Sequence, residues 1–139
     1  DWIDLLSMSH VIEKTNSNTG AARQRSSTTF GDIVVVKDID KSTPKLQESI
    51  AKGERLASAV IDFTRSGGEG QSQTYLKYEL KNVIITSYAF NGGASGDPIP
   101  TDQVSLNFGE IKVTYYPQSR DGAPGTPVSY SWKVEEGTK

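Results

Sequence analysis

The fold of this chain is decided by residues 33–46, which read Ile-Val-Val-Val-Lys-Asp-Ile-Asp-Lys-Ser-Thr-Pro-Lys-Leu. The four β-branched residues 33–36 are apolar at both odd and even positions, and β-branched side chains favour a strand over a helix. Side chains of a strand alternate between its two faces. The run therefore predicts a strand that needs cover on both faces.

The residues that follow predict a helix of about residues 44–52. Pro44 comes directly after Ser42 and Thr43, which is typical of a helix start with a hydroxyl cap and a first-turn proline. Leu46 then begins an apolar face, and Gly53 supplies the stop. So short a helix is marginal in water by itself, so we expect it to lie on a sheet.

The rest of the chain reads as strands separated by turns, which favours a mainly β fold. The expected strands are 2–9, 33–36, 56–65, 73–90, 104–115 and 128–134, with turns at 66–70, 91–102 and 117–127. Six or so strands and one inserted helix indicate a small β-barrel or tightly curled sandwich. At 139 residues, the chain is predicted to form one domain, 1–139.

The apolar parity changes within two of these strands. In residues 73–90 it switches past Asn82, and in residues 104–115 it switches at Gly109-Glu110. If the two strands pair as an antiparallel hairpin, Asn82 and Glu110 lie about level, so both partners change their buried face together. A β-bulge or a bend at this level is predicted.

Composition excludes several classes of function. Fifteen basic residues against seventeen acidic residues give a net charge of −2, which gives no reason to expect nucleic acid or an anionic membrane as a partner. There is no apolar run long enough to cross a bilayer, no visible signal-peptide core and no cysteine. The chain opens at Asp1 and reaches an apolar stretch at once, so we expect the N-terminus to be incomplete.

No residue pattern indicates an active site. His10 is the only histidine, and it lies at the start of a stretch without periodicity, which disfavours a nucleophilic triad. Asp38 and Asp40 could form a carboxylate pair or a metal site, but between Lys37 and Lys41 they are more typical of a solvated, salt-bridged patch. We therefore predict no enzyme, no metal and no cofactor.

Two kinds of feature suggest a role in assembly: stretches that are apolar on both faces, and one long segment without periodicity. Apolar residues stand on both faces of 33–36, of 82–85 and of the 115–116 end, although a lone small barrel has only one interior. Self-association is the consequence, as a ring or a filament if the contact is head-to-tail. Residues 13–29 form the longest stretch without periodicity, and a loop of that length is usually functional or disordered.

The chain resembles the haemolysin-coregulated proteins (Hcp), the tube subunits of bacterial type VI secretion systems. The resemblance rests on residues 37–46 leading to Gly53, on 75–88, on 106–118, and on the last strand, 128–134. The residues that carry the family's strand-to-helix signature are Lys37, Asp38, Asp40, Ser42, Thr43, Pro44 and Leu46.

The resemblance implies a barrel of two curled antiparallel sheets with one flanking helix, assembled into hexameric rings with an open centre. Rings stack into a tube inside a contractile sheath with its spike, leave the bacterial cytoplasm without a signal peptide, and can hold effector proteins in the lumen. The 13–29 segment matches the family's extended loop toward the next ring, which implies ring-stacking roles for Asn16, Asn18, Gly20, Arg23 and Arg25. Ser7 and Ser9 stand where members often carry a Trp-Ser-Trp-type segment near the lumen, which implies contact with cargo.

One departure from the family concerns the first strand. Members begin with a further strand of roughly twenty residues before the position of Trp2, so the resemblance implies that the barrel of this chain is short of one strand, with an unpaired edge. Two alternatives stay open, a contractile-phage tail tube subunit and a non-catalytic carbohydrate-binding β-domain. The 37–46 segment favours the secretion branch.

Overall fold

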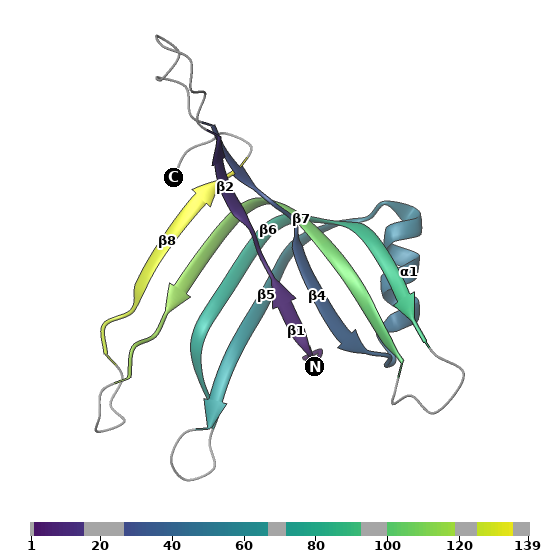
Figure 1. Cartoon of the computed structure of the whole chain (residues 1–139), viewed down its shortest axis with the longest axis horizontal. Helices are drawn as coiled ribbons and strands as arrows, with labels where there is room; N and C mark the ends of the chain where they lie inside the picture. The colour runs from purple at the N-terminus through teal and green to yellow at the C-terminus, as the bar shows by residue number, and fades with distance from the viewer. Residues whose placement is uncertain (1, 16–26, 67–71, 93–99, 119–124, 135–139) are drawn as a thin grey trace. The chain divides into compact units, whose positions relative to one another are not determined.

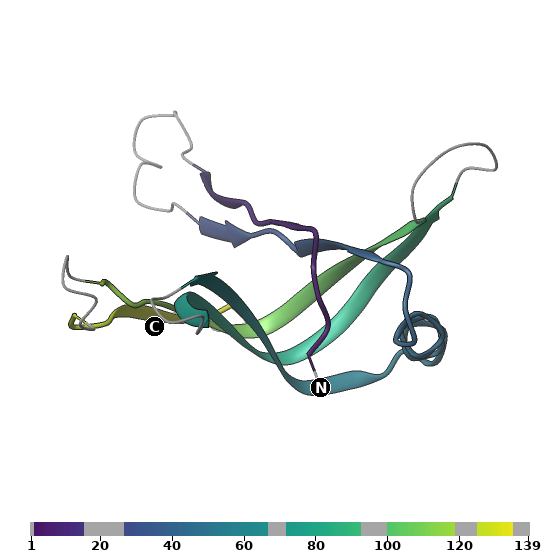
Figure 2. The same cartoon turned by 90° about the horizontal axis from the view of Figure 1, so that it is seen from below.

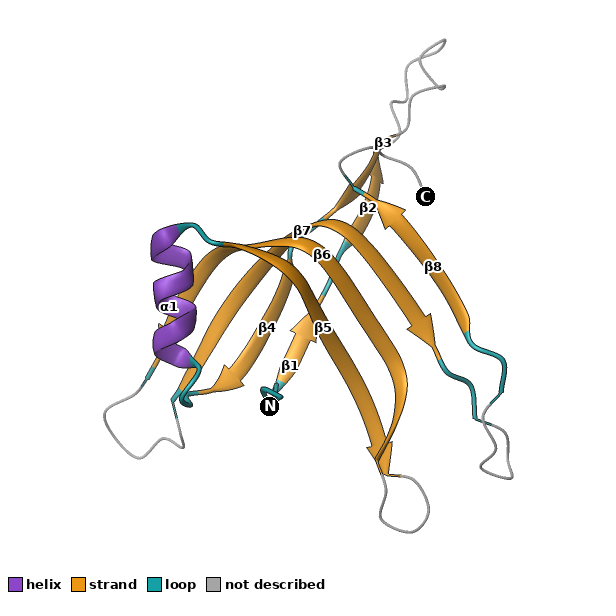
Figure 3. Ribbon diagram, turned by 180° about the vertical axis from the view of Figure 1, so that it is seen from behind, coloured by secondary structure: helices purple, strands orange, loops and turns teal. Residues whose placement is uncertain are grey.

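The computed structural model describes residues 2–15, 27–66, 72–92, 100–118 and 125–134. These residues form eight strands and one helix (Figures 1 and 3). The elements are β1 Ser7–Ser9, β2 Ile12–Thr15, β3 Ser27–Phe30, β4 Ile33–Asp38, α1 Thr43–Lys52, β5 Arg55–Ser66, β6 Ser72–Asn91, β7 Thr101–Tyr115 and β8 Val128–Lys133. The predicted mainly β class with one short helix is confirmed.

The chain divides into two compact units. The first consists of residues 1–55 and 83–107, and the second of residues 56–82 and 108–139. One sheet has the strand order β1-β4-β7-β6-β5, with β8 also paired to β7, and β2 and β3 form a separate two-stranded sheet. The long strands β6 and β7 each contribute residues to both units. The prediction of a single domain over 1–139 stays a prediction.

In the first unit, β4 lies between β1 and β7 and pairs antiparallel with both. Its burial alternates: Ile33 and Val35 are buried, whereas Val34 and Val36 are half-buried. The buried side chains meet Val104 of β7 and lie in the same core as Val83 and Ile85 of β6, all of them at most 7% exposed. The predicted strand is confirmed, and one of its faces is the more deeply buried.

The first strand is shorter than predicted. We expected residues 2–9 to be a strand, but only Ser7–Ser9 pair with β4, at Val34–Val36. The amide of Leu6 still donates to the carbonyl oxygen of Val36 at 2.7 Å. The prediction of a strand over residues 2–6 is wrong, and Trp2 at their start is 70% exposed.

Helix α1 begins one residue before the predicted start and ends where it was predicted to end. The predicted hydroxyl cap is wrong, because the Ser42 side chain makes no capping bond to the helix amides. Instead the Asp40 carboxylate accepts bonds from both the amide and the hydroxyl of Ser42. Gly53 closes the helix at φ 66°, and its amide donates to the carbonyl oxygen of Ile50. A left-handed residue at this position is the usual glycine stop.

The stretch predicted to be a structureless loop begins and ends in strands. Residues 13–15 belong to β2 and residues 27–29 to β3, paired from Ile12 opposite Phe30 to Thr15 opposite Ser27. Figure 2 shows β2 and β3 running side by side. The loop prediction is therefore wrong at both ends, and residues 16–26 lie outside the described residues. β-branched Ile12, Thr28 and Thr29 are the strand signals that the longer aperiodic stretch concealed.

β1 and β2 together run antiparallel to β3 and β4, with a change of register between the two ladders. Ser9 lies opposite Val34, but Ile12 lies opposite Phe30, so three residues on one strand face two on the other. The Gly31 amide donates to the Val11 carbonyl oxygen at 2.8 Å within this interval. This is the geometry of a β-bulge.

The second unit contains β5, the first part of β6, the second part of β7, and β8. Its buried apolar side chains are Ile61, Leu80, Phe108 and Ile111. β8 pairs antiparallel with β7, with Trp132 opposite Ile111. The strands predicted at 56–65 and 128–134 are confirmed to within a residue. The turns predicted at 66–70, 91–102 and 117–127 fall largely outside the described residues, and Thr101 and Asp102 already belong to β7.

The change of buried parity is confirmed in both long strands. In β6, buried Leu80 is followed by buried Val83, which has the opposite parity, and in β7 buried Phe108 is followed by buried Ile111. Between Leu80 and Val83 stands Asn82 with φ 53°, the one non-glycine residue of positive φ in the described ranges. Asn tolerates this left-handed conformation better than most residues do. A single unusual backbone angle therefore coincides with the switch in β6.

Candidate functional site

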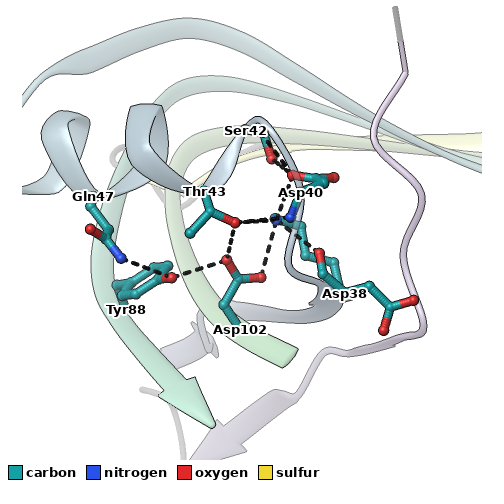
Figure 4. Close-up of polar contacts among 8 residues, drawn as sticks. Asp38, Asp40, Ser42, Thr43, Gln47, Tyr88 and Asp102 are labelled. Atoms are coloured by element: carbon teal, nitrogen blue, oxygen red, sulfur yellow. Dashed lines mark hydrogen bonds and ion pairs between the residues drawn. The ribbon is translucent and has the colours of Figure 1, made fainter. Parts of the chain in front are cut away.

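Four of the family-signature residues meet where β4 leads into α1 beside β7; they are Lys37, Asp40, Ser42 and Thr43 (Figure 4). Lys37 ends the buried face of β4, and its side chain is only 1% exposed. Its ammonium donates to Asp40 Oδ1 at 3.0 Å, to the Asp38 carbonyl oxygen at 3.2 Å and to Thr43 Oγ1 at 3.3 Å. It also forms an ion pair of 3.1 Å with Asp102 Oδ1. A buried lysine is tolerated only with such partners.

Asp102 connects this ammonium to two further elements. It is 0% exposed, and its Oδ2 accepts hydrogen bonds of 3.0 Å from the Thr43 hydroxyl of α1 and from the Tyr88 hydroxyl of β6. Gln47 of α1 in turn donates to the Tyr88 hydroxyl at 3.2 Å. Oδ1 is thus ion-paired and Oδ2 hydrogen-bonded, which offsets part of the cost of burying the carboxylate. We refer to Lys37, Asp40, Thr43, Tyr88 and Asp102 as the junction network.

The charges of the junction network reinforce one another. Burial by itself lowers the pKa of Lys37, but its hydrogen bonds and attraction to Asp40 and Asp102 outweigh burial and raise it. The bond from the Ser42 hydroxyl, followed by the bond from Lys37, lowers the pKa of Asp40 to about 2. Lys37 and Asp40 are therefore both charged at neutral pH.

The interpretation of this segment as a solvated patch was wrong for Lys37, which is buried. The carboxylate pair is not formed either: Asp38 is exposed, and Figure 4 shows its carboxylate pointing away from that of Asp40. Among the described residues, no group of three or more His, Asp or Glu side chains is placed to hold a metal ion. All partners of the Lys37 ammonium are oxygens of the protein itself, so the geometry supports a structural role that connects β4, β7 and α1.

The remaining signature residues shape the helix that starts here. Pro44 is in the first turn, Ser42 is bonded to Asp40, and Leu46 is half-buried. Sequence reasoning missed Asp102, Tyr88 and Gln47. A signal for Asp102 existed, because it has the same parity as buried Val104 and so places an acid on the core face of β7.

The structure describes the predicted cargo residues but not the predicted ring-stacking residues. Ser7 and Ser9 are exposed on β1, opposite Val36 and Val34. His10 stacks on Phe30 with ring centroids 6.2 Å apart, and partial burial lowers its pKa. The predicted ring-stacking residues lie outside the described residues; they are Asn16, Asn18, Gly20, Arg23 and Arg25.

Large apolar side chains are exposed in each unit. In the first unit they are Trp2, Ile3, Leu6, Val11, Ile12 and Phe90, and in the second they are Val60, Tyr115, Val128 and Tyr130. Exposed apolar groups gathered in one stretch, such as the N-terminal twelve residues, favour association.

In the part of the chain that the structure describes, no helix has the length and apolarity to cross a membrane.

Comparison with known proteins adds a family. Residues 1–115 match the family model described as "Type VI secretion system effector, Hcp". The protein named Hcp1 of Pseudomonas aeruginosa is 39% identical over 106 residues, which are 76% of this chain and 64% of that protein. The chain thus matches less than two thirds of the length of this relative.

Solved structures show the same fold. A type six secretion system protein superposes with a TM-score of 0.87 at 18% identity, over 99% of this chain and 85% of that chain. Hcp1 from Salmonella typhimurium superposes with a TM-score of 0.76 at 19% identity, over 98% of this chain and 83% of that chain.

Proposed function

The chain belongs to the Hcp family of type VI secretion proteins, a family of structural, secreted tube proteins and not of enzymes, and from this we propose that it is a subunit of the secretion tube. In this proposal six copies close into a ring, rings stack into the inner tube, and the lumen carries effector proteins. The match of the family model to residues 1–115 carries the proposal. It favours the secretion branch over a phage tail tube or a carbohydrate-binding domain.

The surface of the described residues supports self-association. The stretch from Trp2 to Ile12 exposes five large apolar side chains, and Tyr115, at an end predicted to be apolar on both faces, is 46% exposed. Soluble monomers rarely leave such groups clustered in water, whereas subunit interfaces are rich in them. Because every copy carries the same surface, a head-to-tail contact closes into a ring when its rotation permits.

The partners follow from the same proposal. They are further copies of the chain within and between rings, effector proteins in the lumen, and the sheath and spike of the secretion machine. Neither nucleic acid nor membrane insertion has a role in it, consistent with the net charge of −2. The subunit is made in the bacterial cytoplasm and leaves the cell with the expelled tube, without a signal peptide.

Native mass spectrometry of the intact protein over a range of concentrations tests the ring. We expect a species of six subunits that accumulates with concentration, and annular particles by negative-stain electron microscopy. A protein that stays monomeric at the highest concentration, with no annular particles, would overturn the proposal.

A second experiment separates stacking from ring formation. Thr15 lies opposite Ser27, so an Asn-Gly turn in place of residues 16–26 would join β2 and β3 as a two-residue hairpin. We expect this variant to form rings but not tubes. Its control keeps the length of residues 16–26 and scrambles their order. Tubes that form as well with the short turn as with the natural segment contradict a stacking role.

A further inference from the structure

Lys37 and Asp102 are direct partners in the ladder between β4 and β7, at the same level as their buried ion pair. On the core face of this ladder, Ile33 lies opposite Leu106, Val35 opposite Val104, and Lys37 opposite Asp102. The amide of Ile39 extends the same alignment by donating to the carbonyl oxygen of Pro100 at 3.1 Å. The charged pair is therefore one rung of an otherwise apolar row.

The apolar rungs do not specify this alignment by themselves. A slip of one residue would move the apolar side chains of one strand from the core face to the outer face of the sheet. The loss of burial therefore excludes a one-residue slip. A slip of two residues keeps every side chain on its own face. One such slip places Val35 opposite Leu106, and the other places Ile33 opposite Val104, so branched apolar side chains still meet branched apolar side chains.

The charged rung responds differently to the same slips. One slip places the Lys37 ammonium opposite Val104, and the other places the Asp102 carboxylate opposite Val35. Either arrangement buries a charge opposite an apolar side chain, which is strongly unfavourable. Both charges are also tied to the start of α1 through Thr43, which accepts from Lys37 and donates to Asp102.

We propose that the buried Lys37–Asp102 pair fixes the register of β4 on β7, by excluding the two-residue slips that the apolar side chains alone would tolerate. The inference concerns how the chain finds one alignment and does not depend on the proposed tube. A buried polar group that selects one register at a cost in stability is the best-attested role of such pairs.

Disulfide trapping reads the register directly, because the chain has no cysteine. Val36 lies opposite Gln103, so the pair V36C/Q103C reports the native alignment. V36C/S105C and V36C/T101C report the two slips, since each becomes a direct pair only after a shift of two residues. Diagonal neighbours stand about 7–8 Å apart in an antiparallel pair, too far for a ready disulfide. Each protein is oxidised at high dilution while it refolds, and its cross-linked fraction is measured by mass.

The three cysteine pairs are compared in the natural background and in K37M/D102L, which replaces the charges with apolar groups of similar size. We expect V36C/Q103C to cross-link almost completely in the natural background and the two slipped pairs to cross-link only at a trace level. In K37M/D102L the slipped cross-links should rise by about a hundredfold relative to that background, the factor that corresponds to a lost buried charge penalty. Slipped cross-links no more frequent than in the natural background would overturn the proposal, even if K37M/D102L is less stable.

Two controls keep the outcome decisive. E48L/K52M removes an exposed ion pair of the same 3.1 Å length, and it should leave the slipped cross-links at the natural level. A rise in E48L/K52M equal to that in K37M/D102L would overturn the proposal. If K37M/D102L fails to fold, K37Q/D102N removes both charges while it keeps polarity and volume, and the same two outcomes apply to it.

Discussion

The amide of Gly31 donates a 2.8 Å hydrogen bond to the carbonyl oxygen of Val11 where the register changes between the β1–β4 ladder and the β2–β3 ladder. A Cβ at residue 31 would lie 3.2 Å from that same oxygen, which is tighter than an ordinary contact. At the bulge between the β2–β3 hairpin and β1–β4, two backbones therefore approach closely, and a larger side chain at residue 31 would be crowded.

Gly31→Val should destabilise the protein by about 1–3 kcal/mol, because the branched side chain must push the Val11 carbonyl away. Urea unfolding followed by circular dichroism measures this loss. Gly31→Ala should lie close to neutral, since its reduced chain entropy in the unfolded state opposes the milder crowding. The exposed neighbour Thr28 serves as the control, and Thr28→Val should change little. Equal effects of the two valine substitutions would contradict the close approach.

Two ion pairs of equal length should differ greatly in their contribution to stability. Lys37–Asp102 and Lys52–Glu48 both measure 3.1 Å, but the first pair is buried and the second is exposed. Asp102→Ala should cost about 3–5 kcal/mol, because it removes the buried partner of the Lys37 ammonium and leaves only the more exposed Asp40 as its counter-charge. Glu48→Ala should cost less than about 1 kcal/mol. Chemical denaturation of both variants at neutral pH measures the two losses of unfolding free energy. Similar losses would contradict the claim that burial sets the contribution of an ion pair to stability.

The backbone angle of Asn82 predicts an unusual order of substitutions. Asn82→Gly should be neutral or slightly stabilising, because glycine adopts φ 53° without strain. Asn82→Val should cost about 1–2 kcal/mol, since a β-branched residue is strained in the left-handed region. Thermal unfolding ranks the variants. The exposed neighbour Lys81 provides the control. Lys81→Gly should destabilise the protein more than Asn82→Gly does, because glycine weakens a regular strand.

Asp40 should contribute to acid stability in a defined pH window. Its pKa is about 2 in the folded state against 3.8 for the free group, so protons bind the unfolded chain more tightly. The contribution is fully present above about pH 4 and is lost as pH falls from about 4 to 2. Unfolding free energies of the natural protein and of Asp40→Asn should therefore differ at pH 5 and converge toward pH 2. The difference should be modest, since Asp40 is substantially exposed and solvent screens its charge. A constant difference across this range would contradict the role of the carboxylate charge.

Much of the fold could be predicted from the sequence because local signals agree with the tertiary structure. The β-branched run at 33–36, the Pro44 start and the Gly53 stop correspond to β4 and α1. The parity switch past Asn82 could be predicted because the alternation of apolar and polar residues reflects which face of a strand is buried. Lys81 Nζ also lies 4.0 Å from Glu110 Oε2, as expected if residues 82 and 110 are about level.

The candidate site could be predicted only in part because its partners are distant in sequence. Lys37 and Asp102 are brought together by strand pairing, and Asp40 and Thr43 by the turn into α1. Without the pairing, a lysine followed closely by two aspartates is typical of a solvated patch, which is why the burial of Lys37 was missed. The β2–β3 hairpin was missed for a related reason, because two four-residue strands at the ends of a polar stretch carry too short a pattern to stand out.

Because Lys37 is buried, the rate at which its amine is acylated can measure how often the junction of β4 and α1 opens. Amine-acylating reagents attack the neutral, accessible form, which Lys37 lacks in the folded state, whereas Lys52 is 60% exposed at its side chain and open to attack. Acylation at residue 37 therefore requires the strand-to-helix junction to part first. Its rate relative to that at residue 52 would report how often this junction opens while the remainder of the protein stays folded.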